Sequence, residues 1–499
     1  MEFNYYWDPD TSRRKLLKTI GMVGLAGVAM PGVLSPEALA GTDQIEPPHD
    51  WRIPVYLEAD GTPVYDDAGL RFIDYSEVMH GIYLTAAMAR DSEMGHPSYR
   101  DGRLYEEEMA PRAERWLDLF AIVNKRFEEV GVIAPYVDPD TWEPSGEPQL
   151  REYQHAAYGT YHMHHRSGRF MEHGIDLMMN ILYIPLRYSS QVPRYLLDEH
   201  YSDGRFYHDR AHASFDFESM AYGLAGAHPI PYGWIVWLRE GGHTHIDHWF
   251  GYTASDVIDI AKDVKAELDS AWDPSRSIYD FGGESTIPID AVGAMARAQK
   301  VLWELLYMHG DDEDAARDLF DQSAAMLEAV FDSDIVTQQG LPSHVDFTEN
   351  GVVAGSDTVD IKRQWEFVCH LTGGFAHTRE RDGMAMFIDE VRPELGTKLG
   401  ETTDTLLHGV PEYQLDPDGR VVTELDHSTG AVTDDRIHTA TVGTFILGIG
   451  NSYRAGSDFE RPGNFDDTVP EEMRERSIEL YDIQLANTKL LEQEFLREP

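Results

Sequence analysis

The segment AVGAMARAQKVLWELLYMH, Ala291–His309, is followed by Gly310 and then by EDAARDLFDQSAAMLEAVF, Glu313–Phe331. Both segments carry apolar residues at the three- and four-residue spacing of an amphipathic helix. Acidic residues from Asp312 to Asp314 stand at the start of the second segment, where the helix dipole favours them. The stretch therefore predicts two consecutive helices joined by a short turn.

The same pairing of helices recurs along the chain. Asp74–Arg90 and Glu107–Val130 form a second predicted pair, separated by a loop rich in Gly, Asp and Pro. Further predicted helices are Glu152–His165, Arg169–Tyr188, Phe217–Ala225, Ser255–Ala271 with Ser255 as its N-cap, Val359–Ala376, Gly383–Val391, Arg436–Asn451 and Pro470–Arg497. Strand patterns are scarce, and the candidates are Trp234–Arg239, Gly351–Ala354 and Arg420–Leu425. The sequence therefore predicts a mostly α fold.

The length, the helix pairs and the long loops resemble the (α/α)6 toroid of six-hairpin glycosidases and related lyases. The resemblance covers about Asp74 to Arg497 and rests on architecture, so no catalytic residue is carried over from that family. It implies a ring of six helical hairpins with an active cleft on the face built by loops. We expect one helical toroid domain over residues 71–499, after an extended leader over residues 41–70.

The first 40 residues have the order of a twin-arginine export signal. Arg13-Arg14 precede an apolar run from Ile20 to Leu34, and Ala38-Leu39-Ala40 supplies a small-x-small cleavage site. The run is too short and too rich in glycine for a membrane-spanning helix, which needs about 20 apolar residues. We expect the twin-arginine translocation machinery to export the folded protein, with an extracellular location and no stable membrane insertion after cleavage.

The chain is strongly acidic, with 88 Asp and Glu against 41 Lys and Arg and a formal net charge of −47. It still contains 42% hydrophobic residues, enough for a folded core. The acid is spread along the chain, a pattern that resembles secreted proteins of extreme halophiles. Nucleic-acid binding is excluded as a function because no basic patch could meet phosphates. An anionic substrate would be repelled unless its site gathered arginines locally. Cys369 is the only cysteine, so no intramolecular disulfide can form.

Residues that can act in catalysis or ligand binding are most concentrated between His155 and His248. This stretch contains more than half of the 22 histidines and many aromatic residues. Aromatic rings can stack on sugar rings while carboxylates and amides meet the hydroxyls. The region therefore predicts a site for a carbohydrate, or for another small-molecule or polymer substrate. The candidate substrate-binding residues are Tyr222, Trp234, Trp237, Trp249, Tyr252, His162 and Arg239.

Four carboxylates in this region are candidate catalytic residues: Asp216, Glu218, Glu240 and Asp247. Glycoside hydrolysis needs two carboxyl groups across the scissile bond, and an acid in aromatic surroundings has its pKa raised as a proton donor requires. Phe215 and Phe217 flank Asp216 in the sequence. The leading hypothesis is a secreted glycoside hydrolase with Asp/Glu acid–base chemistry. A polysaccharide lyase or a sugar epimerase, which would use Tyr or His, is a related alternative.

His243-Thr-His245-Ile-Asp247-His248 resembles the H-x-H-x-D-H pattern of the metallo-β-lactamase superfamily. That resemblance implies zinc ligands at His243, His245 and His248, with Asp247. The flanking segments are predicted to be mostly helical, unlike that fold, so a metal-dependent hydrolase stays an alternative. A non-catalytic extracellular glycan-binding protein is a third hypothesis. The sequence identifies no cofactor: either none is required or a divalent metal serves. No P-loop or G-x-S-x-G element occurs, which argues against nucleotide hydrolysis and the α/β-hydrolase mechanism.

Overall fold

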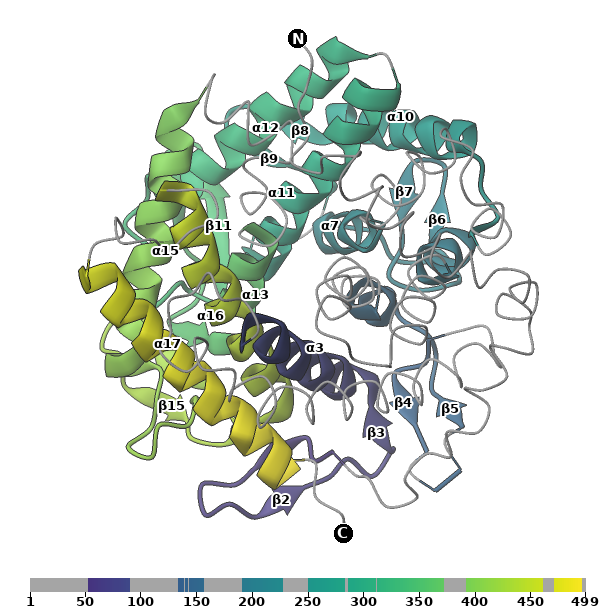
Figure 1. Ribbon diagram of the computed structural model, residues 1–499. Coiled ribbons are helices and arrows are strands. Elements are labelled where there is room, and N and C mark those ends of the chain that lie inside the picture. Colours follow the sequence, from purple (N-terminus) through teal and green to yellow (C-terminus); the bar gives the residue numbers. More distant parts are fainter. Residues whose placement is uncertain are drawn as a thin grey trace, which may run out of the picture.

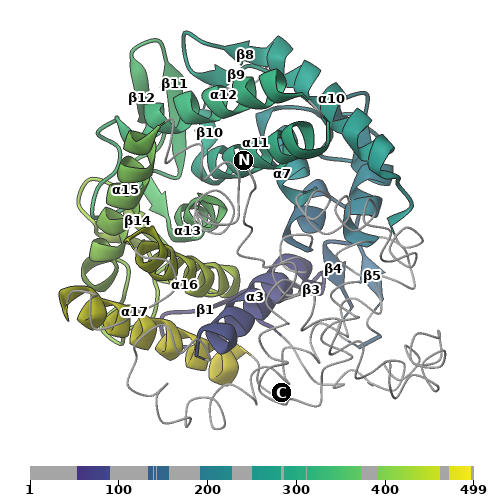
Figure 2. The ribbon, with the colours of Figure 1, turned by 45° about the horizontal axis from the view of Figure 1, so that its top comes forward.

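The computed structural model describes residues 53–89, 133–156 except 139 and 142, 191–227, 250–282, 286–310, 312–371, 392–460 and 471–495. The described helices form two concentric layers around a common centre (Figures 1 and 2). The inner layer contains α3 (Phe72–Ala89), helical residues 150–156, α7 (Phe217–Gly226), α11 (Ile289–Glu304), α13 (Ile361–His370) and α16 (Thr439–Glu460).

Contacts between neighbouring inner helices close this layer into a ring. Helix α16 packs against α3 and α13, and α11 packs against α13 and α7. Helical residues 150–156 fill the remaining place, since His155 forms an ion pair with Glu77 of α3, with 2.5 Å between Nδ1 and Oε1. On their other side, Gln154 approaches Gly226 of α7. The expectation of a mostly α (α/α)6 toroid is confirmed.

The outer layer lies outside this ring (Figure 2). Its described helical segments are residues 191–200, α10 (Ala254–Ala271), α12 (Glu313–Phe331), α15 (Pro393–Tyr413) and α17 (Glu471–Leu490). Two π-helical turns, η7 (Leu305–His309) and η9 (Leu491–Phe495), extend α11 and α17. Helix α12 packs against α11, and α17 packs against α16 and α3. Among the described segments, no helix is long and apolar enough to span a membrane.

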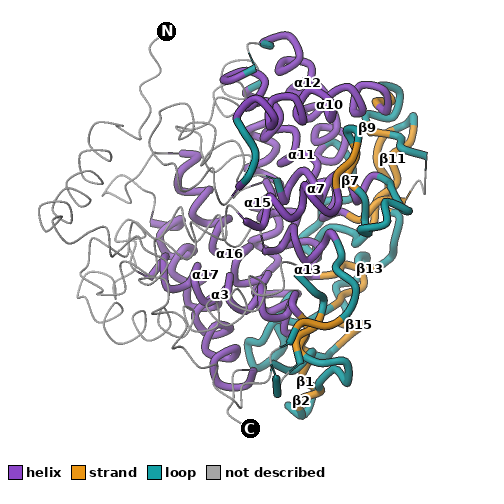
Figure 3. Tube along the Cα trace, turned by 90° about the vertical axis from the view of Figure 1, so that its right-hand side faces the viewer, coloured by secondary structure: helices purple, strands orange, loops and turns teal. Residues whose placement is uncertain are grey.

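Short antiparallel strands gather on one face of the ring (Figure 3). The sheets are β16–β1–β2 (Ile437–His438, Tyr56–Leu57, Pro63–Val64), β3–β4–β5 (Leu70–Arg71, Tyr136–Val137, Pro144–Ser145), β6–β7 (Tyr201–Ser202, Arg205–Phe206), β8–β9 (Trp272–Asp273, Ile278–Tyr279), β10–β11–β12 (Thr286–Pro288, His344–Thr348, Gly351–Ala354) and β13–β14–β15 (Thr358–Asp360, Glu424–Asp426, Val432–Asp434). Strands β3, β10, β13 and β16 each end at the residue before an inner helix begins. This face therefore carries the N-terminal ends of those inner helices.

Glycines let the inner helices approach one another closely. A Cβ atom on Gly443 of α16 would lie 2.4 Å from the carbonyl carbon of Glu77 in α3. Gly293 of α11 faces Phe367 in the same way, and Gly448 of α16 faces Trp365. Backbone packed against backbone or against a large ring holds the ring of helices tight around its centre.

The structure corrects several predicted boundaries. Helix α10 has its N-cap at Thr253, whose side chain accepts from the Asp256 N–H, so the prediction of Ser255 was wrong. Helix α13 begins at Ile361 because Asp360 caps it. Helix α16 begins at Thr439 because Ile437–His438 forms a strand. Helix α15 was not predicted. The predicted strand Gly351–Ala354 is confirmed as β12.

Candidate active site

A cavity of about 500 Å³ opens on the strand-bearing face of the ring. Each of the six inner helices contributes to the lining from its first turn, through Asp74, Arg151, Glu218, Asp290, Lys362 and Thr441 respectively. The remaining lining residues are Arg71, Ile73, His208, Tyr222, Asp360, Arg363, Thr423, Glu424, Asp434, His438 and Ala440. The positive ends of the helix dipoles therefore converge on a cavity that already gathers four Arg and Lys side chains.

Asp290 is held by three donors in the wall of this cavity. Its Oδ2 accepts from Arg151 Nη2 at 2.8 Å and from the Tyr222 hydroxyl at 2.7 Å. Its Oδ1 accepts from Arg363 Nη1 at 3.2 Å. The residue is 1% exposed. Two guanidinium groups and a hydroxyl donor fix the orientation of the Asp290 side chain.

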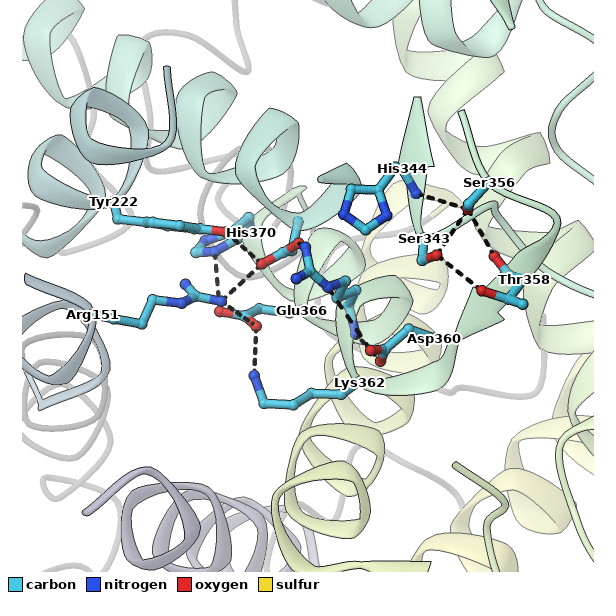
Figure 4. Close-up of polar contacts among 12 residues, drawn as sticks. Arg151, Tyr222, Ser343, His344, Ser356, Thr358, Asp360, Lys362, Glu366 and His370 are labelled. Carbon is cyan, nitrogen blue, oxygen red and sulfur yellow. Dashed lines mark hydrogen bonds and ion pairs between the residues drawn. The ribbon is translucent and has the colours of Figure 1, made fainter. Parts of the chain in front are cut away.

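Arg151 connects Asp290 to a second buried carboxylate, that of Glu366. Figure 4 shows Arg151 and Lys362 beside Glu366. Its Nη2 also donates to Glu366 Oε2 at 2.9 Å, and its guanidinium carbon lies 3.7 Å from the centre of the Tyr222 ring. Lys362 Nζ donates to the same Glu366 oxygen at 3.0 Å. Burial acts to raise the pKa of Glu366, but Arg151, Lys362 and nearby histidines outweigh it and hold that pKa well below its usual range. Glu366 thus anchors both cations beside the cavity.

Glu218 has the opposite environment to Asp290. It lies in the first turn of α7, partly buried, on the cavity wall. Burial raises the pKa of Glu218, and the neighbouring charges of Asp216 and Asp290 raise it further. A carboxyl group in such surroundings keeps its proton to higher pH than an exposed one. The cavity therefore holds one carboxyl group suited to donate a proton, Glu218, and one fixed by three donors, Asp290.

Asp216 serves α7 as its N-cap. Its side chain accepts from the Ser219 N–H at 2.9 Å, and its Oδ1 pairs with His208 Nε2 at 2.8 Å. Burial acts to raise the pKa of Asp216, but these hydrogen bonds outweigh it and lower that pKa. The same pairing with Asp216 raises the pKa of His208, whose ring lines the cavity. Asp216 thus orients a histidine at the cavity beside Glu218.

A second corner of the cavity contains Arg71 and Asp74. Arg71 Nε lies 3.5 Å from Asp74 Oδ2. Asp74 is 2% exposed, and its Oδ2 has no hydrogen-bond partner. Burial raises the pKa of Asp74 to about 7, against the opposing charges of Arg71 and Lys362. This corner therefore combines two cations with a carboxyl group that burial drives towards its neutral form.

The structure places four of the predicted site residues. Glu218 and Tyr222 line the cavity, and Asp216 contacts His208 at its wall. Tyr252 lies elsewhere, and its hydroxyl donates to Asp198 Oδ1 at 2.6 Å. The other predicted residues lie outside the described residues: His162, Trp234, Trp237, Arg239, Glu240, His243, His245, Asp247, His248 and Trp249.

Sequence reasoning missed Asp290, Arg151, Lys362 and Arg363. Their signal is positional, because each lies in the first turn of an inner helix. A short strand immediately before an amphipathic helix, as in Thr286–Pro288, would have marked that position. Within the described ranges, no group of three or more His, Cys, Asp or Glu side chains is arranged to hold a metal ion.

Comparison with known proteins gives similarity of structure alone. No protein-family profile and no curated protein sequence matches this chain. Among solved structures, it is similar to a sugar epimerase from a ruminal bacterium, with 13% identity, a TM-score of 0.49, and 85% of this chain and 96% of the other covered. It is also similar to a D-mannose isomerase, with 10% identity, a TM-score of 0.46, and 82% and 90% covered. An α-1,2-mannosidase from Trichoderma reesei gives 10% identity, a TM-score of 0.46, and 79% and 78% covered.

Proposed function

We propose that this protein is a carbohydrate-active enzyme that hydrolyses a glycosidic bond in the central cavity. The observation that carries the proposal is the pair of carboxyl groups on the cavity wall, Glu218 and Asp290, in opposite environments. The volume of about 500 Å³ lies in the range of pockets that enclose small ligands. The polar wall, with Thr423, His438 and Glu424 among its residues, suits the hydroxyl groups of a sugar.

Glu218 is assigned as the proton donor. Its proton passes to the glycosidic oxygen as the bond from that oxygen to the anomeric carbon breaks, so the leaving group departs as a neutral alcohol. The raised pKa of Glu218 keeps the proton on this carboxyl group to higher pH than on an exposed glutamate.

Asp290 is assigned as the carboxylate that faces the positive charge developing on the sugar ring. Arg151, Arg363 and Tyr222 orient it. Water supplies the hydroxyl group that ends on the anomeric carbon. The remaining proton of this water replaces the one that Glu218 gave to the leaving group. Because Arg151 covers one face of the Tyr222 ring, the described contacts give Tyr222 a positioning role through its hydroxyl.

The proton donor can be tested without knowledge of the natural leaving group. A panel of aryl glycosides first identifies a cleaved sugar, and Glu218→Gln is then compared with the parent protein. A general acid matters most when the leaving group is poor, so we expect a loss of about 10²–10⁴-fold on alkyl glycosides. On dinitrophenyl glycosides, whose leaving group needs no proton, the loss should be much smaller.

The matched control is Glu313→Gln, on the exposed surface of α12, where Glu313 pairs with Arg317. It should cleave both classes of glycoside as the parent does. Equal losses on good and poor leaving groups in Glu218→Gln would contradict the role of proton donor.

Isomerisation or epimerisation of a free sugar is the second candidate, favoured by His208 and His438 on the same cavity wall. Proton transfer at carbon in D2O would place deuterium in the recovered sugar, which proton NMR detects. Hydrolysis of a glycoside leaves the carbon-bound hydrogens of the sugar in place.

We also propose that the protein is exported by the twin-arginine route and works outside the cell. The support is the order of Arg13-Arg14, the apolar run and Ala38-Leu39-Ala40, all outside the described residues. Replacing both arginines with lysine should retain the protein inside the cell with its full-length N-terminus. Unchanged secretion of that variant would contradict the proposal.

A further inference from the structure

The charge of the chain sets a condition on any anionic substrate. With a formal net charge of −47, the protein repels anions unless cations are concentrated where they bind. Four Arg and Lys side chains line the one central cavity described above. The question is which of them have donors left for a ligand.

Arg151 and Arg363 are already engaged. Arg151 donates to Gln154, Asp290 and Glu366, and its guanidinium stacks on Tyr222. Arg363 donates to Asp290. Arg363 Nε also lies 3.8 Å from Asp360 Oδ2. Both arginines therefore serve the positioning of Asp290.

Among the described contacts, Arg71 takes no part in holding Asp290. Its side chain is 34% exposed, and within the described part of the chain its one ion-pair partner is Asp74, whose oxygen lies 3.5 Å from Nε. That ion pair uses Nε, so it leaves the two terminal guanidinium nitrogens for other partners, and Arg71 lines the cavity. A guanidinium with two parallel N–H groups binds a carboxylate in a bidentate manner.

Lys362 adds a second cation to the same corner. Of its three N–H donors, one is used by Glu366 Oε2 at 3.0 Å. The charges of Lys362 and Arg71 both act on Asp74, which lies in the cavity wall with an oxygen that has no hydrogen-bond partner. A buried acceptor without a partner, 2% exposed, marks a place where a hydroxyl group of a ligand would be bound.

We propose that the sugar bound in the central cavity is a uronic acid, with its carboxylate on Arg71 and Lys362 and a hydroxyl group on Asp74. This deepens the proposed function and rests on it. A carboxylate fits better than a phosphate because six carboxyl groups share the lining with four cations, so a single negative charge is tolerated more easily than two. The N-terminal ends of α3, α13 and α16 add their partial positive charge at this corner.

Binding tests the inference without turnover. Calorimetry on the full chain carrying Glu218→Gln compares glucuronate, galacturonate and mannuronate with the matching neutral sugars and with glucose 6-phosphate. We expect at least one uronate to bind about tenfold or more tightly than its neutral parent. Adding Arg71→Gln should remove this preference while changing the affinity for the neutral sugar by less than about twofold, and Arg71→Lys should retain part of it.

The control is Arg276→Gln, since Arg276 pairs with Asp273 and Asp280 away from the cavity lining. It should keep the full preference. Thermal melts of each variant show whether it folds. The inference is overturned if no uronate binds, if neutral sugars bind equally well, if glucose 6-phosphate binds more tightly than the uronates, or if the folded Arg71→Gln variant keeps the preference. Retained turnover in Glu218→Gln would overturn the assigned proton donor and leave the uronate preference as a separate result.

Discussion

At the scale of single residues, the site depends on the different surroundings of the carboxyl groups in the first turns of the inner helices. Asp290 is surrounded by donors, whereas Glu218 and Asp74 lose water without gaining equivalent donors. The same residue types therefore acquire different protonation chemistry through their neighbours.

Asp74 gives this contrast a measurable consequence. Its pKa is about 7 in the folded protein and near its ordinary value of 3.8 when unfolded. The folded state thus holds more protons between about pH 4 and pH 7, so the contribution of Asp74 to stability falls as pH rises through that window. Each unit of pKa difference corresponds to roughly 1.4 kcal/mol. We expect Asp74→Asn to abolish this loss.

The measurement is the free energy of unfolding by denaturant at pH 4.5 and pH 7.5, for both proteins. Glu152, whose pKa burial also raises to about 7, contributes the same trend to both and cancels in the comparison. Parallel pH profiles for the parent and for Asp74→Asn would show that Asp74 stays ionised in the folded state.

Residue identities at the site were only partly accessible from the sequence. Glu218 and Tyr222 emerged because aromatic residues surround them in the chain. Arg71, Arg151 and Asp290 come from three distant segments, and the hydrogen bond between Arg151 and Asp290 joins residues 139 positions apart in the sequence. A local sequence pattern cannot predict such a contact, because the contact forms only when the distant segments come together in the folded ring.

At the scale of elements, helix starts are set by capping residues, and these can be tested directly. Thr253 caps α10 in a reciprocal arrangement with Asp256. Ser255 is the second residue of α10 and is exposed. We expect Thr253→Ala to reduce the free energy of unfolding by about 1 kcal/mol and Ser255→Ala to leave it nearly unchanged. The reverse order in denaturant titrations would restore Ser255 as the cap.

Close helix packing gives the second prediction at this scale. Gly443→Ala would place a Cβ 2.4 Å from the backbone of Glu77, and an inner helix has no room to move aside. We expect a loss of roughly 1–3 kcal/mol or more in stability. Gly400→Ala in α15 meets nothing within 4 Å and should be neutral or stabilising by about 1 kcal/mol. Thermal melts of the two variants compare them, and equal stability would contradict the close approach of α3 and α16.

Amphipathic periodicity found most described helices because apolar spacing is a local property. It missed α15, where Gly396, Gly400 and Pro411 weaken the helical signal and packing on α12 and α16 supplies the stability. It also predicted two helices that begin too early and include residues of β13 and β16. The reason is that a strand of two or three residues continues the apolar pattern of the helix that follows it.

At the scale of the whole molecule, the helix pairs predicted from the sequence indicated the ring, but they did not indicate which of its two faces carries the site. The face is determined by chain direction, because short strands on one side of the ring lead directly into four of the inner helices (Figure 3). The N-terminal ends of the inner helices therefore line one cavity. In a chain with a net charge of −47, these helix ends and four cations offset part of the negative charge of the six carboxyl groups in the cavity lining.

The central claim is that sugar chemistry takes place in this cavity, between Glu218 and Asp290. The most direct measurement is a crystal structure of the Glu218→Gln variant soaked with the sugar that the parent protein processes. We predict a sugar ring among the first turns of the inner helices, with a glycosidic oxygen within hydrogen-bond distance of residue 218. A sugar bound outside this cavity, in a variant that still turns it over, would contradict the account.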